Sequence, residues 1–492
     1  MNSLVIRGAC LTLLALCNLT AHAEERLHRY TVTVDADLRT LDAVACFAGR
    51  APDLLMAESF DASGAFVEAR VRGSGGRALK ANGVELPLRA VPPDGCIEYR
   101  VSVSGNQSRH DHSGNTTRRI GRDLFTEVGL WFWRPAQLGA DEDIEISFRL
   151  PEGISVSAPW RPVPAVDGVP TYRVGRGAWD RPSAVAFGRF RERLLEVPGG
   201  SLRLAILDGT PPADADGVVR WLDDAARSVA AVYGRFPVPS PQVLVMPGAR
   251  AAEPTPWAYV LRGGQASVHF FINQRRPLQE FVEDWTATHE LSHLLLPYVQ
   301  SSDAWLSEGM ASYYQNVARA RSGAISAADA WQRMHSGFRR AADWSSRGMN
   351  LAQATERMFR DGGYMRVYWH GAAILFMADV ELRERSGGIQ SLDTVLEAFG
   401  RCCLDPDVEW TARRVFERFD ALSGTDIFTT IFEREVRNPN FADLGPVYAR
   451  LGLEALGGKL GMRSEAPLRS VRDAIMARGP YETPGTLLAR RP

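Results

Sequence analysis

Residues 29–150 alternate between apolar and polar side chains, the period of β-strands that bury one face. The clearest runs lie at 30–34, 66–71, 97–103 and 144–148. Gly, Asp and Pro residues separate these runs, as turns between strands require. The pattern predicts an antiparallel β-sandwich, and we assign it residues 24–200.

The pattern changes after residue 200, where predicted strands and helices mix. Strand-like runs lie at 202–206, 242–246 and 267–272. An amphipathic helix is expected at about 217–233, and a longer one from about 278 to 296, where Pro297 ends it. These elements predict an α+β domain over residues 201–400.

From residue 312 onwards, apolar residues recur every three or four positions, as on amphipathic helices. The predicted helices span 327–342, 368–385, 391–398, 410–422 and 425–435. They predict a helical subdomain and tail over residues 401–492 that cap the preceding domain. The chain of 492 residues is therefore expected to be a multidomain α+β protein, because a single core stops growing at about 250–300 residues.

Composition is that of an ordinary globular protein, with 45% hydrophobic and 23% charged residues and a net charge of -1. This balance provides no electrostatic field for nucleic acid or acidic lipid. The first 23 residues resemble a secretory signal peptide, with a basic residue, a short apolar run and small residues at 21 and 23. A cleaved signal peptide predicts a periplasmic or secreted bacterial protein without a membrane segment. Lipidation at Cys17 is the less favoured alternative, because Leu16 is bulkier than the residue that normally precedes a lipidated cysteine.

Four cysteines follow the signal peptide, and we interpret all of them as structural. In an oxidising compartment Cys46 and Cys96 are candidates for a disulfide, although sequence alone does not fix the pairing. Cys402 and Cys403 are awkward partners because they are adjacent. None of the four has the spacing of a metal site with histidine nearby.

A polar run at 104–119 predicts a long surface loop. His110 and His112 within it could suggest a metal site, but no further ligand is near them in the sequence, so a solvated loop is the preferred interpretation. Whether this loop closes over a cleft is left open.

The strongest chemical signal is the motif His-Glu-Leu-Ser-His at 289–293. On a helix, His289 and His293 are one turn apart, so both imidazoles lie on one face and can bind one metal ion. Glu308, fifteen residues later on the next predicted helix, is the candidate third ligand. Three protein ligands and one open position are typical of a catalytic zinc site, whereas four protein ligands close a structural one. We therefore expect one zinc ion.

This set of residues predicts hydrolysis of a peptide bond. Zinc lowers the pKa of a bound water. Glu290 lies beside the ligands without being one, so it can act as the general base and later pass the proton to the leaving amine. The developing oxyanion needs another donor, and Tyr364 and Tyr368 lie in a glycine-bounded segment that could supply it.

The motif, together with Trp-Leu-Ser-Glu-Gly at 305–309 and the tyrosine pair at 313–314, resembles the gluzincin peptidases. The closer similarity is to the glycyl aminopeptidase family, and the more distant one to the aminopeptidase N family. The resemblance covers about 200–455 and implies a thermolysin-like catalytic domain. It also implies that Tyr368 stabilises the tetrahedral intermediate, with Tyr364 as the runner-up. Tyr368 matches the tyrosine of the family's Tyr-x-Lys-Gly motif, in which His370 here replaces the lysine.

The chain departs from these families in three ways. The interval between His293 and Glu308 is short, and no PDZ domain appears to follow. Where aminopeptidase N carries Gly-x-Met-Glu-Asn, this chain has Gly-Gly-Gln-Ala-Ser at 263–267, without an acid. An aminopeptidase needs a carboxylate for the substrate's α-ammonium, so the choice between exopeptidase and endopeptidase stays open.

The strand at 267–272 could bind an extended peptide by adding a strand, if it forms the sheet edge beside the cleft. Gly263, Gly264, Gln265 and His269 are therefore candidate substrate-binding residues. A packed strand histidine is the alternative for His269.

Two functions follow from these observations. The first is a secreted or periplasmic zinc metallopeptidase that acts on peptide or protein substrates. The alternative is a catalytically impaired peptidase fold that serves as a peptide-binding or scaffold module, which the missing acid and His370 would favour. The intact set of His289, Glu290, His293 and Glu308 favours the enzyme.

Overall fold

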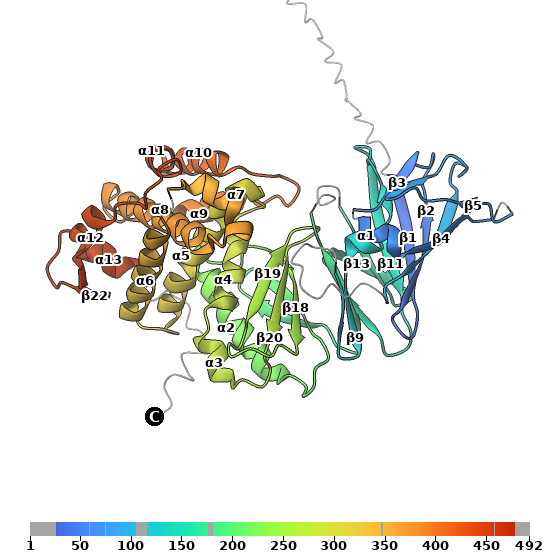
Figure 1. Cartoon of the computed structure of the whole chain (residues 1–492), viewed down its shortest axis with the longest axis horizontal. Helices are drawn as coiled ribbons and strands as arrows, with labels where there is room; N and C mark the ends of the chain where they lie inside the picture. Colours follow the sequence, from blue (N-terminus) through green and yellow to red (C-terminus); the bar gives the residue numbers. More distant parts are fainter. Residues whose placement is uncertain are drawn as a thin grey trace, which may run out of the picture.

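The computed structural model describes residues 26–477 apart from Ser59, Ser74, 105–115, 176–180, 346–347 and Gly457. A β-rich N-terminal part lies beside a larger part in which helices pack over a second sheet (Figure 1). The predicted mixed α+β class is confirmed, and the domain boundaries at 200 and 400 stay predictions. Of the described helices, none combines the length and the apolar character that crossing a membrane requires. The predicted signal peptide, residues 1–23, lies outside the described residues.

An eight-stranded sheet organises the N-terminal part. In spatial order its strands are β13 (Arg161–Val166), β14 (Val169–Arg173), β11 (Glu142–Arg149), β1 (Arg26–Val34), β2 (Thr40–Cys46), β7 (Cys96–Ser102), β4 (Phe66–Val71) and β5 (Ala78–Leu79). Neighbours are antiparallel except β1 and β11, which run parallel. The prediction of a wholly antiparallel arrangement is wrong at this pair, because alternation of side chains is the same for either direction of pairing.

Two smaller sheets share a core with the large one. The first contains β12 (Ser155–Ser157), β15 (Ala184–Gly188), β9 (Asp123–Glu127) and β8 (Thr117–Ile120), and the second contains β10 (Arg134–Pro135), β3 (Leu54–Met56) and β6 (Glu85–Pro87). The helix α1 (Phe60–Ala65) and the short helix η1 (Val128–Leu130) lie among them. Side chains from all three sheets surround the consecutive aromatic residues Trp131, Phe132 and Trp133. Of the predicted loop at 104–119, residues 105–115, with His110 and His112, lie outside the described residues, while its last residues belong to β8.

A five-stranded sheet follows, in the order β16 (Arg193–Val197), β17 (Gly200–Ile206), β18 (Gln242–Pro247), β20 (Ser267–Ile272) and β19 (Trp257–Leu261). The helix α2 (Ala215–Tyr233) covers one face. Asp214 caps its first turn by accepting from Gly217 N, and Gly234 ends it in the left-handed conformation at φ 72°. The opposite face packs against β9 and β15 through a small apolar cluster that includes Phe125, Leu244 and Met246.

The predicted helix at 278–296 is divided in the structure. It consists of α3 (Leu278–Glu283), α4 (Thr286–Ser292) and the single turn η2 (His293–Leu295). Asp284 interrupts it, because its backbone is extended and its side chain accepts a hydrogen bond from Thr286 N, which starts a new helix. Because of this break, the direction of α4 does not follow that of α3.

Helices form most of the remainder, as predicted. They are α5 (Ala304–Ser322), preceded by the short helix η3 (Ser301–Asp303), then α6 (Ala327–Ser345), α7 (Leu351–Asp361), α8 (Tyr364–Arg385), α9 (Leu392–Cys402), α10 (Ala412–Ser423), α11 (Ile427–Glu435), α12 (Gly445–Leu451) and α13 (Arg469–Ile475). The exception is a hairpin of β21 (Leu453–Leu456) and β22 (Lys459–Met462). One apolar core extends from the five-stranded sheet to α13, so the C-terminal helices continue the core that begins at this sheet.

Helices α5 and α8 cross at two glycines. A Cβ atom on Gly309 would lie 2.4 Å from the backbone carbon of Gly371, and one on Gly371 would lie 2.1 Å from the carbonyl oxygen of Trp305. Since the neighbouring atoms are backbone, no side-chain movement could make room. The two glycines therefore allow a close approach of the helices that carry Glu308 and Tyr368.

A buried polar network ties α5 and α8 to the start of α9. Arg321 of α5 donates to both carboxylate oxygens of Asp393, at 2.9 and 3.0 Å, and the hydroxyl of Tyr314 donates to the same group at 2.7 Å. Arg383 of α8 bridges Asp393 and Asp379. Bidentate arginine–carboxylate pairs of this kind fix geometry as well as contributing energy.

Both pairs of cysteines form disulfides in the structure. Cys46 and Cys96 face each other on β2 and β7, as the sequence suggested. The expectation that Cys402 and Cys403 are awkward partners is wrong, because a disulfide joins them where α9 ends. The backbone leaves the helix at Cys403, and the two Cα atoms are 3.7 Å apart, the ordinary spacing of consecutive residues.

Candidate metal centre and cleft

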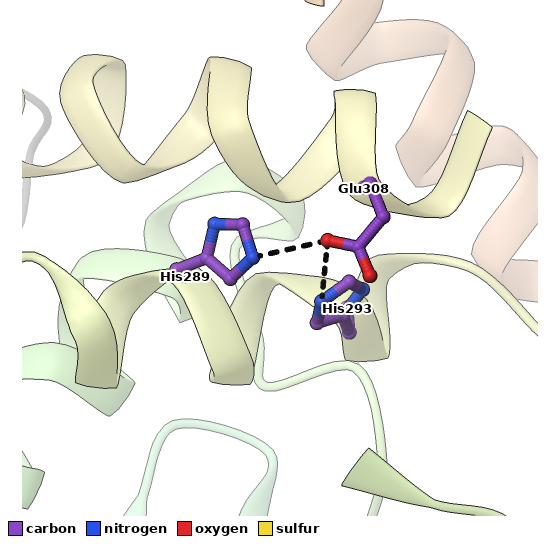
Figure 2. A group of neighbouring side chains, drawn as sticks. All are labelled: His289, His293 and Glu308. Carbon is purple, nitrogen blue, oxygen red and sulfur yellow. Dashed lines mark hydrogen bonds and ion pairs between the residues drawn. The ribbon is translucent and has the colours of Figure 1, made fainter. Parts of the chain in front are cut away.

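The three predicted metal ligands lie together where α5 crosses α4 and η2 (Figure 2). His289 and His293 stand one turn apart, and Glu308 faces them from α5. Nε2 of His289 is 3.3 Å and Nε2 of His293 is 3.6 Å from the same oxygen, Oε2 of Glu308. One donor atom of each residue lies within 4.8 Å of the others.

These separations fit a zinc ion. Donors at about 2.1 Å from a common centre and at tetrahedral angles lie about 3.4 Å apart. The two measured distances, 3.3 and 3.6 Å, agree with that value. Among the described residues, no fourth His, Cys, Asp or Glu completes the group, so a position remains for a water molecule or substrate.

The other ring nitrogen of each histidine is occupied by a hydrogen bond. Nδ1 of His289 lies 2.7 Å from the side-chain oxygen of Gln315, and Nδ1 of His293 lies 2.9 Å from Oγ of Ser307. An amide oxygen only accepts, so His289 donates from Nδ1 and keeps the lone pair of Nε2 for a metal. Sequence reasoning missed both residues. Gln315 stands seven positions after Glu308, two turns along the same helix face, and this spacing could have identified it.

Charges within the centre favour ligation by neutral imidazole and an ionised carboxylate. Burial lowers the pKa of His293 to about 4, which keeps its ring neutral. Burial also lowers the pKa of His289, but the hydrogen bond to Glu308 and the charges of Glu290 and Glu308 outweigh it, and the net shift is upward. Burial opposes ionisation of Glu308, yet the two histidines bring its pKa below the usual range. A metal ion would replace the proton that His289 attracts.

Glu290 lines the cleft beside the three ligands and is only 7% exposed. Burial raises its pKa to about 7, and the charge of Glu308 adds to the shift while His289 opposes it. A carboxylate with this pKa can both take and return a proton near neutral pH. The position of Glu290 beside the ligands and its pKa are therefore those of a candidate general base.

Tyr368 stacks on the imidazole of His289, with 5.8 Å between the ring centres and 21° between the planes. Burial and the charges of Glu308 and Glu290 raise the pKa of its hydroxyl far above the ordinary value, so it keeps its proton. Tyr364 lies one turn earlier on α8, edge-on to Tyr368 at 6.3 Å. Both tyrosines line the cleft, and Tyr368 is the one in contact with a metal-ligand candidate.

A cleft of about 590 Å³ opens in front of the metal centre, within the usual range for ligand sites. One wall is β19, the last strand of its sheet. The opposite wall comes from α7 and the start of α8, with the apolar side chains Met358, Phe359, Tyr364 and Met365. Trp257 and Phe359 are 42% and 74% exposed, so the rim presents apolar surface to solvent.

The predicted substrate-binding loop does not line this cleft. Gly263 N donates to the carbonyl of Pro182, and Gln265 N donates to the carbonyl of Pro159. A Cβ at Gly263 would lie 2.2 Å from the backbone oxygen of Arg181, so the absence of a side chain at Gly263 allows this close contact. Gly264 and Gln265 instead line a neighbouring cavity. The strand at 257–261, which was not anticipated, lies beside the cleft instead, and the substrate-binding role of the loop stays a prediction.

His269 is also placed elsewhere than predicted. β20 lies between β18 and β19, so it is not the edge strand. The ring of His269 is fully buried, 5.4 Å from that of Phe125 on β9, and lies 2.6 Å from Oγ of Ser267. Burial lowers its pKa to about 3. The alternative of a packed strand histidine is therefore the correct one.

His370, which replaces the lysine of the family motif, is fully buried behind the site. Its Nε2 lies 3.7 Å from Oε2 of Glu435, and its ring contacts that of Phe441. It is not among the described residues that line the cleft. The histidine thus belongs to the packing between α8 and the C-terminal helices.

A family model described as M61 glycyl aminopeptidase matches residues 286–371. The matched segment begins with α4 and extends into α8, so it includes every residue from the first histidine to Tyr368. No curated protein matches the chain.

Solved structures share the fold at low sequence identity. An aminopeptidase N family protein of Idiomarina loihiensis is 15% identical with a TM-score of 0.66, over 87% of this chain and 78% of that one. An M1 zinc metallopeptidase of Deinococcus radiodurans is 15% identical with a TM-score of 0.50, over 86% and 96%. A variant of the latter bound to a Tyr-Ser-Ala substrate is 14% identical with a TM-score of 0.51, over 84% and 94%. The family match confirms the resemblance to gluzincin zinc metallopeptidases and the predicted enzyme class, hydrolases of peptide bonds. The solved structures show the common fold.

Proposed function

We propose that this chain, a zinc metallopeptidase by motif and fold, cleaves polypeptides without requiring a free α-amino group on the substrate. The observation that carries the proposal is the convergence of His289, His293 and Glu308 beside Glu290, at the floor of an open cleft. Peptide hydrolysis needs a metal site with an open position, a base and room for a chain, and the cleft supplies all three.

His289, His293 and Glu308 hold one zinc ion in this proposal. When bound, the ion polarises the scissile carbonyl and a water molecule. Glu290 takes the proton of the attacking water and gives it to the leaving amine, which its pKa of about 7 suits. Tyr368 donates a hydrogen bond to the carbonyl oxygen as negative charge develops there. Its protonated hydroxyl supports this role.

The substrate is expected to lie extended along β19. No described strand pairs with the outer edge of β19, and this edge is where a peptide strand could be added. Apolar side chains of the substrate would meet Met358, Phe359 and Met365 on the opposite wall. We expect a preference for large apolar residues near the scissile bond.

Among the described residues that line the cleft, Glu290 and Glu308 carry carboxylates and Arg262 carries a positively charged guanidinium. Arg262 follows β19 directly and lines the cleft. A free α-ammonium near it would be repelled, whereas an acylated or internal amide would not. This charge favours cleavage that does not depend on the amino terminus.

A periplasmic or secreted location also belongs to the proposal. It rests on the predicted signal peptide, and the disulfide between Cys46 and Cys96 is of the kind that persists in oxidising compartments.

Digestion of a peptide library, with each peptide in free and N-acetylated form, tests the function. We expect chelator-sensitive cleavage of both forms at similar rates. Glu290→Gln should lower kcat by at least about 100-fold while zinc content stays unchanged. The matched control is Glu253→Gln at an exposed position, which should behave as wild type. Full activity of Glu290→Gln, or cleavage restricted to free amino termini, would contradict the proposal.

A further inference from the structure

A second cavity of about 310 Å³ adjoins the cleft. The two share Arg262, Pro297 and Tyr298 as lining residues, so they meet at a common wall. A single water needs only about 10–15 Å³ of such space, so this cavity has room for a side chain or the end of a peptide. We call it the arginine pocket, because Arg181, Arg235 and Arg262 line it.

Each of the three arginines is held by neutral groups. Arg181 is 4% exposed, donates to the carbonyl of Pro406 and lies with Cζ 4.1 Å from the ring centre of Tyr298. Arg262 donates to the carbonyls of His293 and Leu296, at 2.8 and 3.2 Å.

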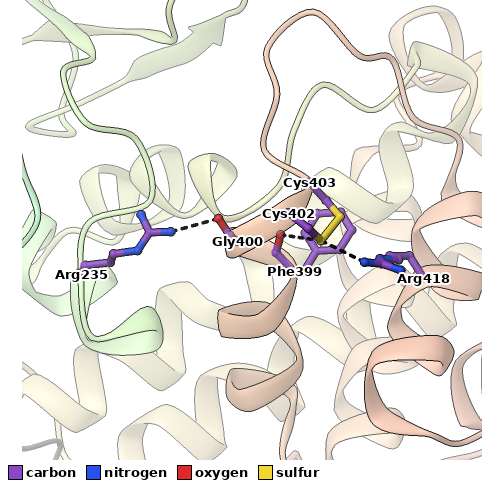
Figure 3. Close-up of a disulfide and its surroundings, with 6 residues drawn as sticks. All are labelled: Arg235, Phe399, Gly400, Cys402, Cys403 and Arg418. Atoms are coloured by element: carbon purple, nitrogen blue, oxygen red, sulfur yellow. Dashed lines mark hydrogen bonds between the residues drawn. A yellow bond between two sulfur atoms is a disulfide. The ribbon is translucent and has the colours of Figure 1, made fainter. Parts of the chain in front are cut away.

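Arg235 is the third arginine that lines the pocket. It donates to the carbonyl of Gly400 at 3.0 Å, beside the disulfide of Cys402 and Cys403 (Figure 3). After that disulfide the chain continues through Leu404 and Pro406, which also line the pocket. Hydrogen bonds to the backbone carbonyls of Pro406 and Gly400 therefore hold Arg181 and Arg235 in the pocket wall.

The positive charge of the arginine pocket is uncompensated within the part of the chain that the structure describes. None of the described lining residues is acidic, and none of the three arginines forms an ion pair with a described residue. Arginine stays protonated in proteins, so three positive charges face one cavity. In addition, Nε of Arg181 is buried and has no hydrogen-bond partner among the described residues. A buried donor of this kind is normally satisfied, which points to a group that arrives from outside.

We propose that the arginine pocket binds a carboxylate of the peptide substrate, supplied by an acidic side chain or by the carboxyl terminus. The inference rests on the proposed peptidase function, because the shared wall places the pocket within reach of a peptide in the cleft. The planar guanidinium fork matches a carboxylate in two parallel hydrogen bonds, and Lys or neutral donors do not reproduce this match. The pocket then selects peptides that place a carboxylate at this position.

Peptide binding to the Glu290→Gln protein tests the proposal without turnover. Fluorescent hexapeptides with an apolar centre are compared in pairs, Glu against Gln at each position and free against amidated carboxyl terminus, by fluorescence anisotropy. We expect one member with a carboxylate to bind at least about 10-fold more tightly than its neutral partner. The Glu/Gln pairs and the amidation pairs separate the two sources of the carboxylate.

Variants of the pocket complete the test. Arg235→Met and Arg181→Met, made separately, should abolish the preference and leave the affinity for neutral peptides unchanged. Arg220→Met, on the exposed face of α2, is the matched control and should retain the preference. Zinc content and circular dichroism check the fold of each variant, and Arg181→Lys keeps the charge should Arg181→Met fail to fold.

Equal affinity of all paired peptides would overturn the proposal, as would a preference that survives in both pocket variants. Stabilisation by inorganic phosphate that depends on Arg181, without any peptide preference, would identify a free-anion site and also overturn it. Absence of hydrolysis by the wild-type protein with a carboxylate preference intact would instead refute the peptidase function and leave the pocket assignment standing.

Discussion

Orientation of the imidazole separates the two motif histidines from other buried histidines of the described chain. His289 and His293 each have one ring nitrogen fixed by a side chain of α5, which leaves the other nitrogen directed at Glu308. His269 and His370 are equally buried, but neither belongs to a group of three potential ligands among the described residues. Burial alone therefore did not mark a candidate ligand, and the hydrogen bonds to Gln315 and Ser307 of α5 did.

Gln315 is expected to set zinc affinity through this orientation. Gln315→Leu removes the acceptor of His289 Nδ1, so the ring loses its fixed tautomer and direction. Zinc affinity, measured by competition with a metallochromic chelator, should fall about 10- to 100-fold. Gln315→Glu supplies a carboxylate acceptor and should restore it. An unchanged affinity in Gln315→Leu would remove Gln315 from the site.

At the scale of elements, the site depends on how closely two helices approach. α4 supplies His289 and Glu290, η2 supplies His293, α5 supplies Glu308, and α8 supplies Tyr368. The sequence predicted these helices because their apolar periodicity and capping residues are local properties. It did not predict the break at Asp284 or the glycine crossing, because both depend on which element lies opposite.

Substitution at the crossing tests this dependence. Gly309→Ala places a Cβ 2.4 Å from the backbone of α8 and must separate the helices. We expect a loss of about 1–3 kcal/mol in the free energy of unfolding, together with lower kcat, because Glu308 and Tyr368 move apart. Chemical denaturation and peptide hydrolysis measure the two effects. Gly363→Ala is the control, since its Cβ would meet its nearest atom at an ordinary 3.5 Å; equal behaviour of both variants would show that the crossing tolerates a methyl group.

At the scale of the whole molecule, the N-terminal part supports the face of the five-stranded sheet that α2 does not cover. Phe125 of β9 and Ala186 of β15 pack against Leu244 and Met246 of β18. Arg203 of β17 extends across the junction and donates to the carbonyl of Ala158 at 2.9 Å. The strand that borders the cleft thus rests on a sheet held from both faces.

Zinc is expected to stabilise the whole fold, because its proposed ligands come from α4, η2 and α5, which belong to one core. Metal at 1,000 times its Kd would contribute about 4 kcal/mol, so chelation should lower the midpoint of thermal unfolding measured by calorimetry. Glu308→Gln, which weakens the site, should show a smaller response to chelator. An equal response in both proteins would mean that the chelator acts elsewhere.

The sequence by itself determined the local features of this protein: the β-rich start, the helical remainder, and the residues proposed as metal ligands and base. Helical spacing alone placed His289 and His293 on one face, and short-range capping and periodicity fixed most elements. Tertiary structure decided which strand borders the cleft, because sheet order depends on pairing between distant segments. It placed β19 there instead of β20, buried His269, and paired Cys402 with Cys403. It also gathered three arginines from separate segments around one pocket, since long-range packing, and not local pattern, brings such residues together.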